Sequence, residues 1–210
     1  MKIAILLFDR FTALDAVGPY EILARMPGAE VVFTAARRGP VRSDLGSLAL
    51  TADATLDEVT AADLLLVPGG PGSLDQCEQP EVLDWLRAVD ATTTWTTSVC
   101  TGSVLLAAAG LLTGRRATTH WLLPQALAGF GAQPVDERVV FDGKYATAAG
   151  VSAGLDLALH LAGRIHDAET AQGIQLLIEY DPQPPYTAGS TRTAPPAVVD
   201  AVRDRFAVRS

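Results

Sequence analysis

Residues 95–112 read WTTSVCTGSVLLAAAGLL, and this stretch predicts a strand that turns sharply at Cys100 into an apolar helix. A strand, one residue in a tight turn and a small-residue helix form the nucleophile elbow that presents a Ser or Cys above a sheet. Unpaired N–H groups at a helix N-terminus favour thiolate, which lowers a cysteine pKa from ~8.5 to ~3.5 to 7.5. The pattern therefore predicts a reactive Cys100, whereas a lone cysteine without this context is more often buried and inert.

The rest of the chain alternates strand-like and helix-like segments. Apolar runs bounded by turns occupy residues 2–8, 31–35, 63–67 and 93–99, with helical patterns between most of them. This alternation predicts an α/β fold, a three-layer sandwich whose mainly parallel sheet is covered by helices on both faces. Pro19 fits a first helical turn, so we expect a helix from about residues 17–19 that leaves Asp15 in the preceding loop. Asp142-Gly143 predicts a hairpin, and residues 151–162 a buried helix.

Several chemically useful residues follow strand ends. Ligands of open α/β sheets bind beyond the carboxyl ends of the strands, where we expect Asp15, Gly69, Gly70 and Cys100 to converge. Glycines let backbone N–H groups approach a developing negative charge, so Gly69 and Gly70 are candidate oxyanion donors; the alternative is a tight turn without chemistry. The loop lacks the Lys-Ser/Thr ending of a phosphate loop and the spacing of a dinucleotide site, which argues against nucleotide binding.

Asp15 is open to two interpretations. A carboxylate before a helix often caps it. Next to a thiol, however, a carboxyl group shares the thiol's proton and becomes available as an acid. Glu21, within the expected helix, is interpreted as a solvated or structural carboxylate.

The three histidines differ in their expected roles. His160 is expected in the core and His166 at the surface, which leaves His120 as the candidate active-site histidine. The residue beside the thiol is Thr101, whose hydroxyl hydrogen-bonds but is no base near pH 7, and this disfavours the usual cysteine-hydrolase arrangement.

Composition sets the broad class. With 210 residues, 49% hydrophobic and 19% charged, the chain is expected to form one domain over residues 1–210. A net charge of −8 without a basic stripe argues against nucleic-acid and membrane partners. The apolar run at residues 2–8 is too short for a signal peptide. Two cysteines, Cys77 and Cys100, give neither a disulfide framework nor metal-ligand spacing, so we expect no metal, no cofactor and a cytoplasmic location.

Together the motifs resemble those of the ThiJ/PfpI superfamily, which is related to class I glutamine amidotransferases and has a flavodoxin-like fold. The resemblance covers nearly the whole chain and is most specific for the isonitrile hydratase branch. Protease and deglycase members have His where Thr101 stands, and the redox-sensor branch has Glu where Asp15 stands. The stretches that carry the resemblance are Leu14-Asp15, Gly18-Pro19-Tyr20-Glu21, Val67-Pro68-Gly69-Gly70, Ser98-Val99-Cys100-Thr101-Gly102, Ala117-Thr118-Thr119-His120-Trp121 and residues 178–185.

The resemblance implies a homodimeric, cofactor-free isonitrile hydratase that adds water to an isonitrile to give an N-substituted formamide. It implies Cys100 as nucleophile and Asp15 as acid and base, with Thr101 and the Gly70 amide orienting the nitrogen and water. His120 as a general base is an open alternative. Trp121 and residues 184–186 are candidate pocket walls. The alternative function is a non-catalytic ligand or oxidation sensor of the same superfamily, since a reactive cysteine serves either role.

Overall fold

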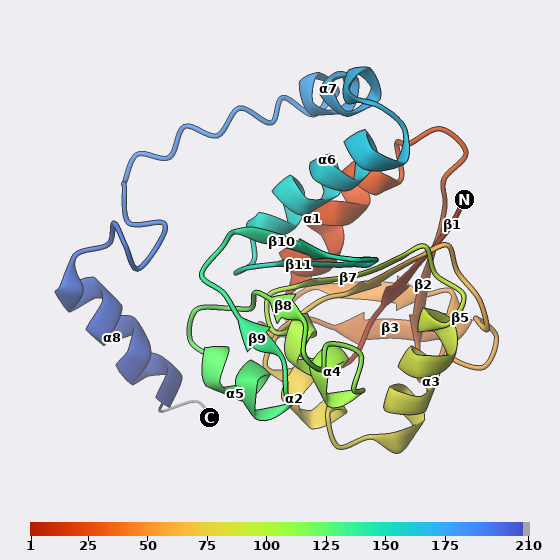
Figure 1. Cartoon of the computed structure of the whole chain (residues 1–210), viewed down its shortest axis with the longest axis horizontal. Coiled ribbons are helices and arrows are strands. Elements are labelled where there is room, and N and C mark those ends of the chain that lie inside the picture. The colour runs from red at the N-terminus through yellow and green to blue at the C-terminus, as the bar shows by residue number, and fades with distance from the viewer. Residues whose placement is uncertain (208–210) are drawn as a thin grey trace. The chain divides into compact units, whose positions relative to one another are not determined.

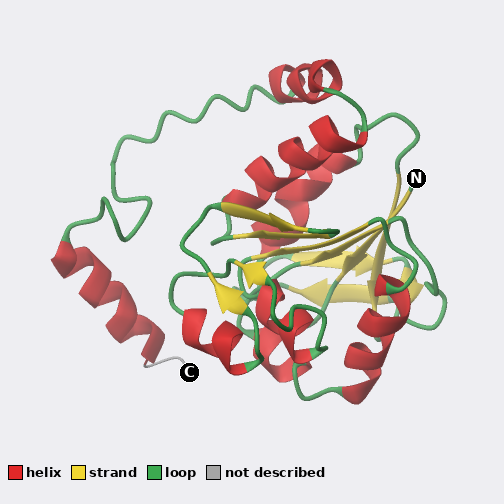
Figure 2. Ribbon diagram, in the orientation of Figure 1, coloured by secondary structure: helices red, strands yellow, loops and turns green. Residues whose placement is uncertain are grey.

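The computed structural model describes residues 1–207 and has a mainly parallel central sheet (Figures 1 and 2). Among the described residues of this sheet, only the hairpin over residues 139–148 is antiparallel, and its turn is the predicted Asp142-Gly143 region. The strands, in spatial order, are β10 (Val139–Asp142), β11 (Tyr145–Ala148), β7 (Trp95–Val99), β6 (Leu64–Val67), β1 (Lys2–Leu6), β2 (Glu30–Ala35) and β5 (Ala54–Thr55).

Helices cover both faces of the sheet, which confirms the predicted sandwich (Figure 1). One face carries α1 (Ala13–Leu23) and α6 (Ala153–Ile165), with α7 (Ala168–Leu177) packed against α6. The other face carries α2 (Gly72–Gln76), α3 (Pro80–Asp90), α4 (Gly102–Ala108) and α5 (Pro124–Gly129). Two small strand pairs complete this part of the chain: β3 (Gly39–Arg42) with β4 (Ala49–Ala52), and β8 (Arg116–Ala117) with β9 (Gln133–Pro134).

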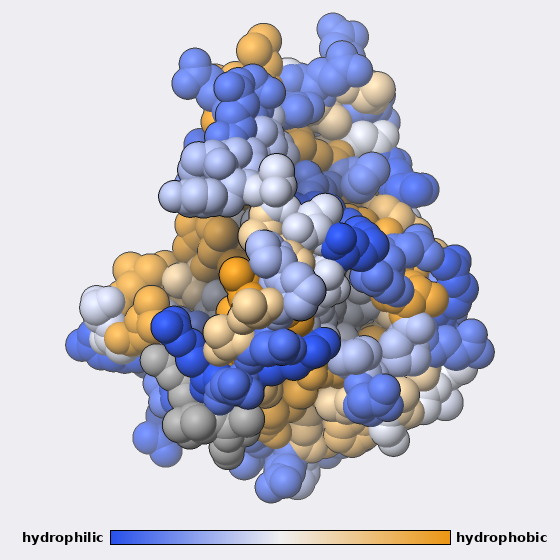
Figure 3. All heavy atoms as spheres, turned by 90° about the vertical axis from the view of Figure 1, so that its left-hand side faces the viewer, coloured by the Kyte–Doolittle hydropathy of each residue, from blue (hydrophilic) through white to orange (hydrophobic). Residues whose placement is uncertain are grey.

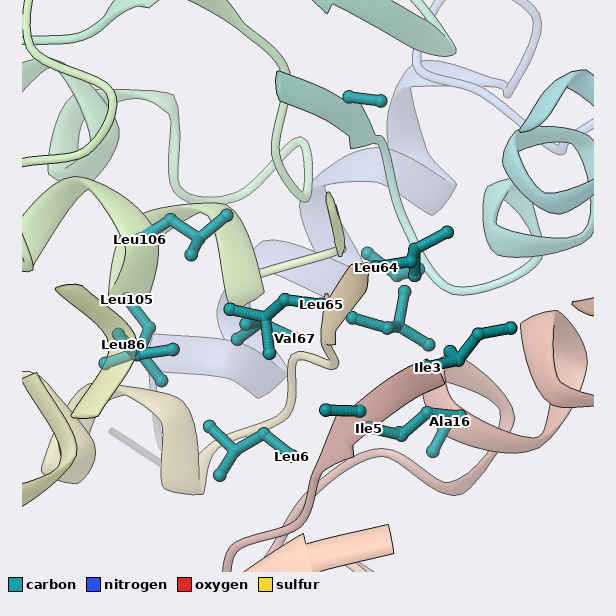
Figure 4. Close-up of a cluster of buried hydrophobic side chains, with 14 of the residues drawn as sticks. Ile3, Ile5, Leu6, Ala16, Leu64, Leu65, Val67, Leu86, Leu105 and Leu106 are labelled. Carbon is teal, nitrogen blue, oxygen red and sulfur yellow. The ribbon is translucent and has the colours of Figure 1, made fainter. Parts of the chain in front are cut away.

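The core lies on both sides of the central strands. Ile3 and Ile5 of β1 and Leu64 and Leu65 of β6 are 0% exposed, as expected for strands sandwiched between two helical layers (Figure 4). Each such side chain contributes about 1.5–3 kcal/mol on burial. The inner strands are therefore rigid supports for the loops that follow them.

The chain divides into two units, Met1–Ile178 and Glu179–Ser210, of which the second is described through residue 207. In the second unit α8 (Pro196–Ala207) follows a segment whose described residues form neither helix nor strand. The prolines at 182, 184 and 185 account for this, because proline lacks the N–H group that regular structure requires. One domain over residues 1–210 stays a prediction.

Two local predictions were wrong. α1 begins at Ala13, so Asp15 lies in its first turn and Pro19 inside the helix. Tertiary packing overrides the unfavourable proline: a Cβ atom on Gly154 of α6 would lie only 3.1 Å from Pro19 Cγ. His160 is exposed on α6 rather than buried in the core, and its ring lies 6.0 Å from that of Phe141.

The surface is mixed in character. Hydrophilic residues cover much of the face shown in Figure 3, with hydrophobic residues between them. Among residues 1–207, none of the helices combines the length and apolar character needed to cross a bilayer.

Candidate active site

Cys100 occupies the predicted elbow between β7 and α4. Its backbone φ is +57°, in the left-handed region that a side chain rarely adopts, at a cost on the order of 1–3 kcal/mol. The Cys100 N–H group donates to the carbonyl oxygens of Ala148 (3.0 Å) and Ala149 (2.9 Å), which hold this conformation. The end of β11 therefore fixes the turn, and the predicted nucleophile elbow is present.

The pKa of the Cys100 thiol differs from the prediction. Burial is the largest influence and raises this pKa above its ordinary value, and the nearby Asp15 charge raises it further. N–H groups of Val151 and Thr101 donate toward the sulfur and lower the pKa, but they do not offset burial. The expected resting thiolate was wrong, because the side chain is only 5% exposed and loses the hydration that stabilises charge.

Asp15 is the partner of this thiol and is fully buried. Burial raises its pKa from 3.8 to about 7, opposed by the Gly69 N–H group, which donates to Asp15 Oδ2 at 2.9 Å. The thiol lowers this pKa and the Asp44 charge raises it. Asp15 Oδ1 has no partner at ordinary hydrogen-bond distance among the described residues. Since the carboxyl group bonds across to Gly69 and makes no cap bond to α1, the capping interpretation was wrong.

Cys100 and Asp15 thus form a coupled acid pair. The carboxyl group gives up its proton near pH 7, while the thiol retains its own to higher pH. Between these values the pair holds one proton, which resides on either oxygen or sulfur. Such a pair supplies a nucleophile and an acid at once.

The glycine loop is already engaged within the protein. The Gly69 N–H group donates to Asp15, and the Gly70 N–H group donates to Thr101 Oγ1 at 2.9 Å. This differs from the predicted oxyanion role, because a donor engaged within the protein is not free for a substrate anion. In this structure the two glycines position Asp15 and Thr101.

The Thr101 hydroxyl has a bonding role that the sequence did not reveal. It donates to the Gly70 carbonyl oxygen (3.2 Å) and contacts the hydroxyl of buried Ser73 (2.8 Å). Its hydrogen bonds therefore join the elbow to the glycine loop. We interpret Thr101 as a positioning residue.

His120 and Trp121 lie near the elbow without joining the acid pair. A Cβ atom on Gly150 would lie 3.0 Å from His120 Cδ2, so the imidazole packs against the segment that follows β11. Burial lowers the pKa of His120, which keeps the ring neutral. Among the described residues His120 makes no hydrogen bond to Cys100 or Asp15. The Trp121 ring lies 5.9 Å from the His120 ring, and the role of both as substrate contacts stays a prediction.

The last two expectations concern a metal site and the pocket wall. Within residues 1–207, no three His, Cys, Asp or Glu side chains gather where they could hold a metal ion. Residues 184–186 lie in the second unit, so their expected role as a pocket wall stays a prediction.

Gly69→Ala is expected to lower activity at least ~100-fold and to destabilise the fold. The added Cβ atom would lie 2.5 Å from Thr101 N and 2.9 Å from Asp15 Oδ2, and overpacking of this kind costs ~1–3 kcal/mol. Gly173→Ala is the matched control, since nothing lies within 4 Å of its Cβ position in α7, and it should be neutral or stabilising. Steady-state rates and urea unfolding of both variants check this; equal behaviour of the two would contradict it.

Comparison with known proteins places this chain in a family. The profile of the DJ-1/PfpI family matches residues 1–164. The chain belongs to the DJ-1/PfpI family. Among the similar members of the DJ-1/PfpI family is the isonitrile hydratase of Pseudomonas putida, 44% identical over 207 residues, which covers 99% of this chain and 90% of the relative.

Two further matches are a solved structure and a transcriptional regulator. The crystal structure of a THiJ/PfpI family protein from Pseudomonas syringae matches with a TM-score of 0.95 and 41% identity, over 98% of this chain and 86% of that chain. The HTH-type transcriptional regulator CdhR of Pseudomonas aeruginosa is 36% identical over 135 residues, which are 63% of this chain and 40% of the regulator. Part of this chain is therefore also similar to part of a longer protein.

Proposed function

We propose that this chain is an isonitrile hydratase that converts an organic isonitrile and water into an N-substituted formamide. The observation that carries the proposal is the buried Cys100–Asp15 pair, in a chain 44% identical over 207 residues to an isonitrile hydratase. The terminal carbon of an isonitrile must gain both a nucleophile and a proton. A pair that holds one proton between sulfur and oxygen supplies both.

In the first step, Cys100 sulfur, as thiolate after its proton passes to Asp15, forms a bond to the isonitrile carbon. The same carbon takes the proton from the Asp15 carboxyl group. The product is a thioimidate, with a C–S bond to the enzyme, a C–H bond and a C=N bond. Asp15 is left as a carboxylate, so charge is conserved.

In the second step, water adds to the thioimidate carbon. Asp15 carboxylate takes a proton from the water, the hydroxyl oxygen bonds to carbon, and that proton passes on to nitrogen. The hydroxyl proton then moves to Asp15 as the C=O bond forms and the C–S bond breaks. Formamide leaves, and the starting one-proton pair is restored. His120, kept neutral by burial, is the alternative base for the water.

The sensor alternative receives less support than the reaction. Oxidation of a cysteine requires an accessible thiolate. Cys100 is buried and burial raises the pKa of its thiol, so a thiolate forms at this site only when its proton passes to Asp15. Because either function would need that thiolate, the preference for the reaction comes from the 44% identity over 207 residues to an isonitrile hydratase.

The direct test is to incubate the purified protein with cyclohexyl isocyanide and follow formamide by NMR. We expect one formamide to form for each isonitrile consumed, with many turnovers per chain and no added cofactor. Binding without turnover would favour a ligand sensor, and neither binding nor turnover across several alkyl isonitriles would reject the proposal.

The pH–rate profile should follow the acid pair. The pKa of Asp15, about 7, separates a two-proton form without a nucleophile at lower pH from the reactive one-proton form at higher pH. We expect kcat/KM to rise about tenfold between pH 6 and pH 8. Initial rates in buffers of constant ionic strength measure this, and a rate that falls over the same interval would contradict the one-proton pair.

We further propose a homodimer in the cytoplasm, with the isonitrile and water as small-molecule partners. The dimer rests mainly on the family resemblance, and the cytoplasmic location rests on the free cysteines Cys77 and Cys100, which suit a reducing compartment. Tyr20 and Leu23 of α1 contribute little to such an interface, since Leu23 is fully buried and the partly buried Tyr20 ring packs 5.3 Å from that of Phe33. Light scattering should give twice the chain mass, and a mass of 22.0 kDa at every concentration would contradict a dimer.

A further inference from the structure

Ser73 is a buried hydroxyl at the centre of the site that the reaction scheme does not use. It lies on α2 and is 0% exposed. Its Oγ atom is 2.8 Å from the Gly70 carbonyl oxygen and 2.8 Å from Thr101 Oγ1. One hydroxyl proton serves only one of these contacts at a time, so the Ser73 and Thr101 hydroxyls must share their protons.

The three residues form a closed set of hydrogen bonds. The Gly70 N–H group donates to Thr101 Oγ1, and its carbonyl oxygen accepts from Ser73 or Thr101. These bonds join the loop after β6 and the adjoining start of α2 to the turn after β7, which lies about thirty residues further along the chain. The loop after β6 also supplies the Gly69 N–H group to Asp15.

We propose that Ser73 is a positioning residue for the Cys100–Asp15 pair. Its hydroxyl holds the glycine loop against the cysteine turn, which keeps the Gly69 N–H group directed at Asp15 Oδ2. The packing leaves little room for another arrangement, since a Cβ atom on Gly69 would lie 2.6 Å from Thr101 Oγ1. This inference rests on the proposed function for its effect on rate, but not for its effect on the thiol.

Loss of the Ser73 hydroxyl has a predictable direction. Without it, the Gly70 carbonyl oxygen keeps the Thr101 hydroxyl and the Ser73 N–H group (3.0 Å) as donors, but the contact between the Ser73 and Thr101 hydroxyls is lost. The glycine loop is then held less firmly against the cysteine turn, and the neighbouring Gly69 hydrogen bond to Asp15 weakens. That bond lowers the pKa of Asp15, whereas burial and Asp44 of the β3–β4 hairpin raise it, and the Cys100 thiol also lowers it. Loosening the loop therefore shifts the balance toward the protonated carboxyl group.

The experiment compares Ser73→Ala with Ser98→Ala. Ser98 is the matched control because it is also 0% exposed, lies two residues before Cys100, and its Oγ atom has no hydrogen-bond partner within residues 1–207. Iodoacetamide labelling of Cys100 is quantified by peptide mass spectrometry from pH 5 to 9. The pH at which labelling reaches half its maximum, the labelling midpoint, reports the titration of the Cys100–Asp15 pair without any isonitrile. Formamide rates over the same range give the effect on turnover.

We expect the labelling midpoint of Ser73→Ala to move up by about half a pH unit, a fraction of the effect of a full charge-assisted hydrogen bond. At pH 7 its kcat/KM should fall about twofold, as this shift of the midpoint requires, whereas Ser98→Ala should match the parent in both measurements. Ser73→Cys, which keeps the shape and a weak donor, should lie between parent and Ser73→Ala and provides the test if the alanine variant does not fold.

A midpoint for Ser73→Ala or Ser73→Cys equal to that of Ser98→Ala would overturn the positioning role. A shifted midpoint in a protein whose parent forms no formamide would support the positioning role while rejecting the hydratase proposal. The two failures are therefore distinguishable.

Discussion

Cys100→Ala is expected to reduce formamide production at least about a thousandfold while the protein stays folded. The covalent step needs a polarisable nucleophile, and alanine offers none. Cys100→Ser should be nearly as inactive, because a buried hydroxyl ionises far less readily than a thiol. Single-turnover assays with mass spectrometry should also show that only the parent forms an adduct, whose mass equals enzyme plus isonitrile.

The matched control is Cys77→Ala. Cys77 lies at the end of α2, is partly exposed, and has a thiol whose pKa burial raises to about 11. Its thiol donates to the Ser73 carbonyl oxygen at 3.3 Å and is not coupled to Asp15, so it is not the predicted nucleophile. We expect this variant to keep parental rates. Activity of either Cys100 variant above a tenth of the parent, a threshold of about 1.4 kcal/mol, would count against covalent catalysis.

Much of the fold was predictable from local signals. Uninterrupted apolar runs such as the one containing Leu64 and Leu65 specify strands buried on both faces. The succession of Val99, Cys100 and Gly102 specified the elbow. Glycine at position 102 lets the start of α4 lie close to the end of β6, since a Cβ atom there would lie 2.1 Å from the Val67 carbonyl oxygen. These signals are local, so sequence reading found them.

The properties of the site depended on distant residues and were less predictable. The helix N-terminus suggested a low thiol pKa, yet burial of Cys100 outweighs it. The partner of the Gly70 N–H group, Thr101, is 31 residues away, and Ser73 gave no sequence signal beyond its place three residues after that glycine. The start of α1 at Ala13, well before Pro19, likewise depends on packing against α6. Burial and long-range hydrogen bonds are properties of the assembled fold.

Asp15→Asn is expected to be almost inactive, with a loss of about a thousandfold or more, and yet more stable than the parent at pH 8. The amide preserves the shape and accepts from the Gly69 N–H group, but it cannot take up and return a proton. Glu21→Gln is the control on the same helix. Its carboxylate pairs with Arg25 at 2.7 Å near the surface, so its activity should match the parent.

The stability gain follows from the direction of the Asp15 pKa. This pKa is about 7 in the folded state against 3.8 for a free carboxyl group, so the folded protein binds the proton more tightly than the unfolded chain does. Parental stability must therefore fall as pH rises from about 4 to about 7, by at most a few kcal/mol, and stay low above that. Asparagine does not ionise, so the variant does not lose stability in this way. The difference in the free energy of unfolding between variant and parent should therefore grow with pH. Urea unfolding at pH 5 and pH 8 measures this difference. A variant that keeps more than a tenth of the activity would remove Asp15 from proton transfer, and a difference that shrinks with pH would contradict a buried, raised carboxyl pKa.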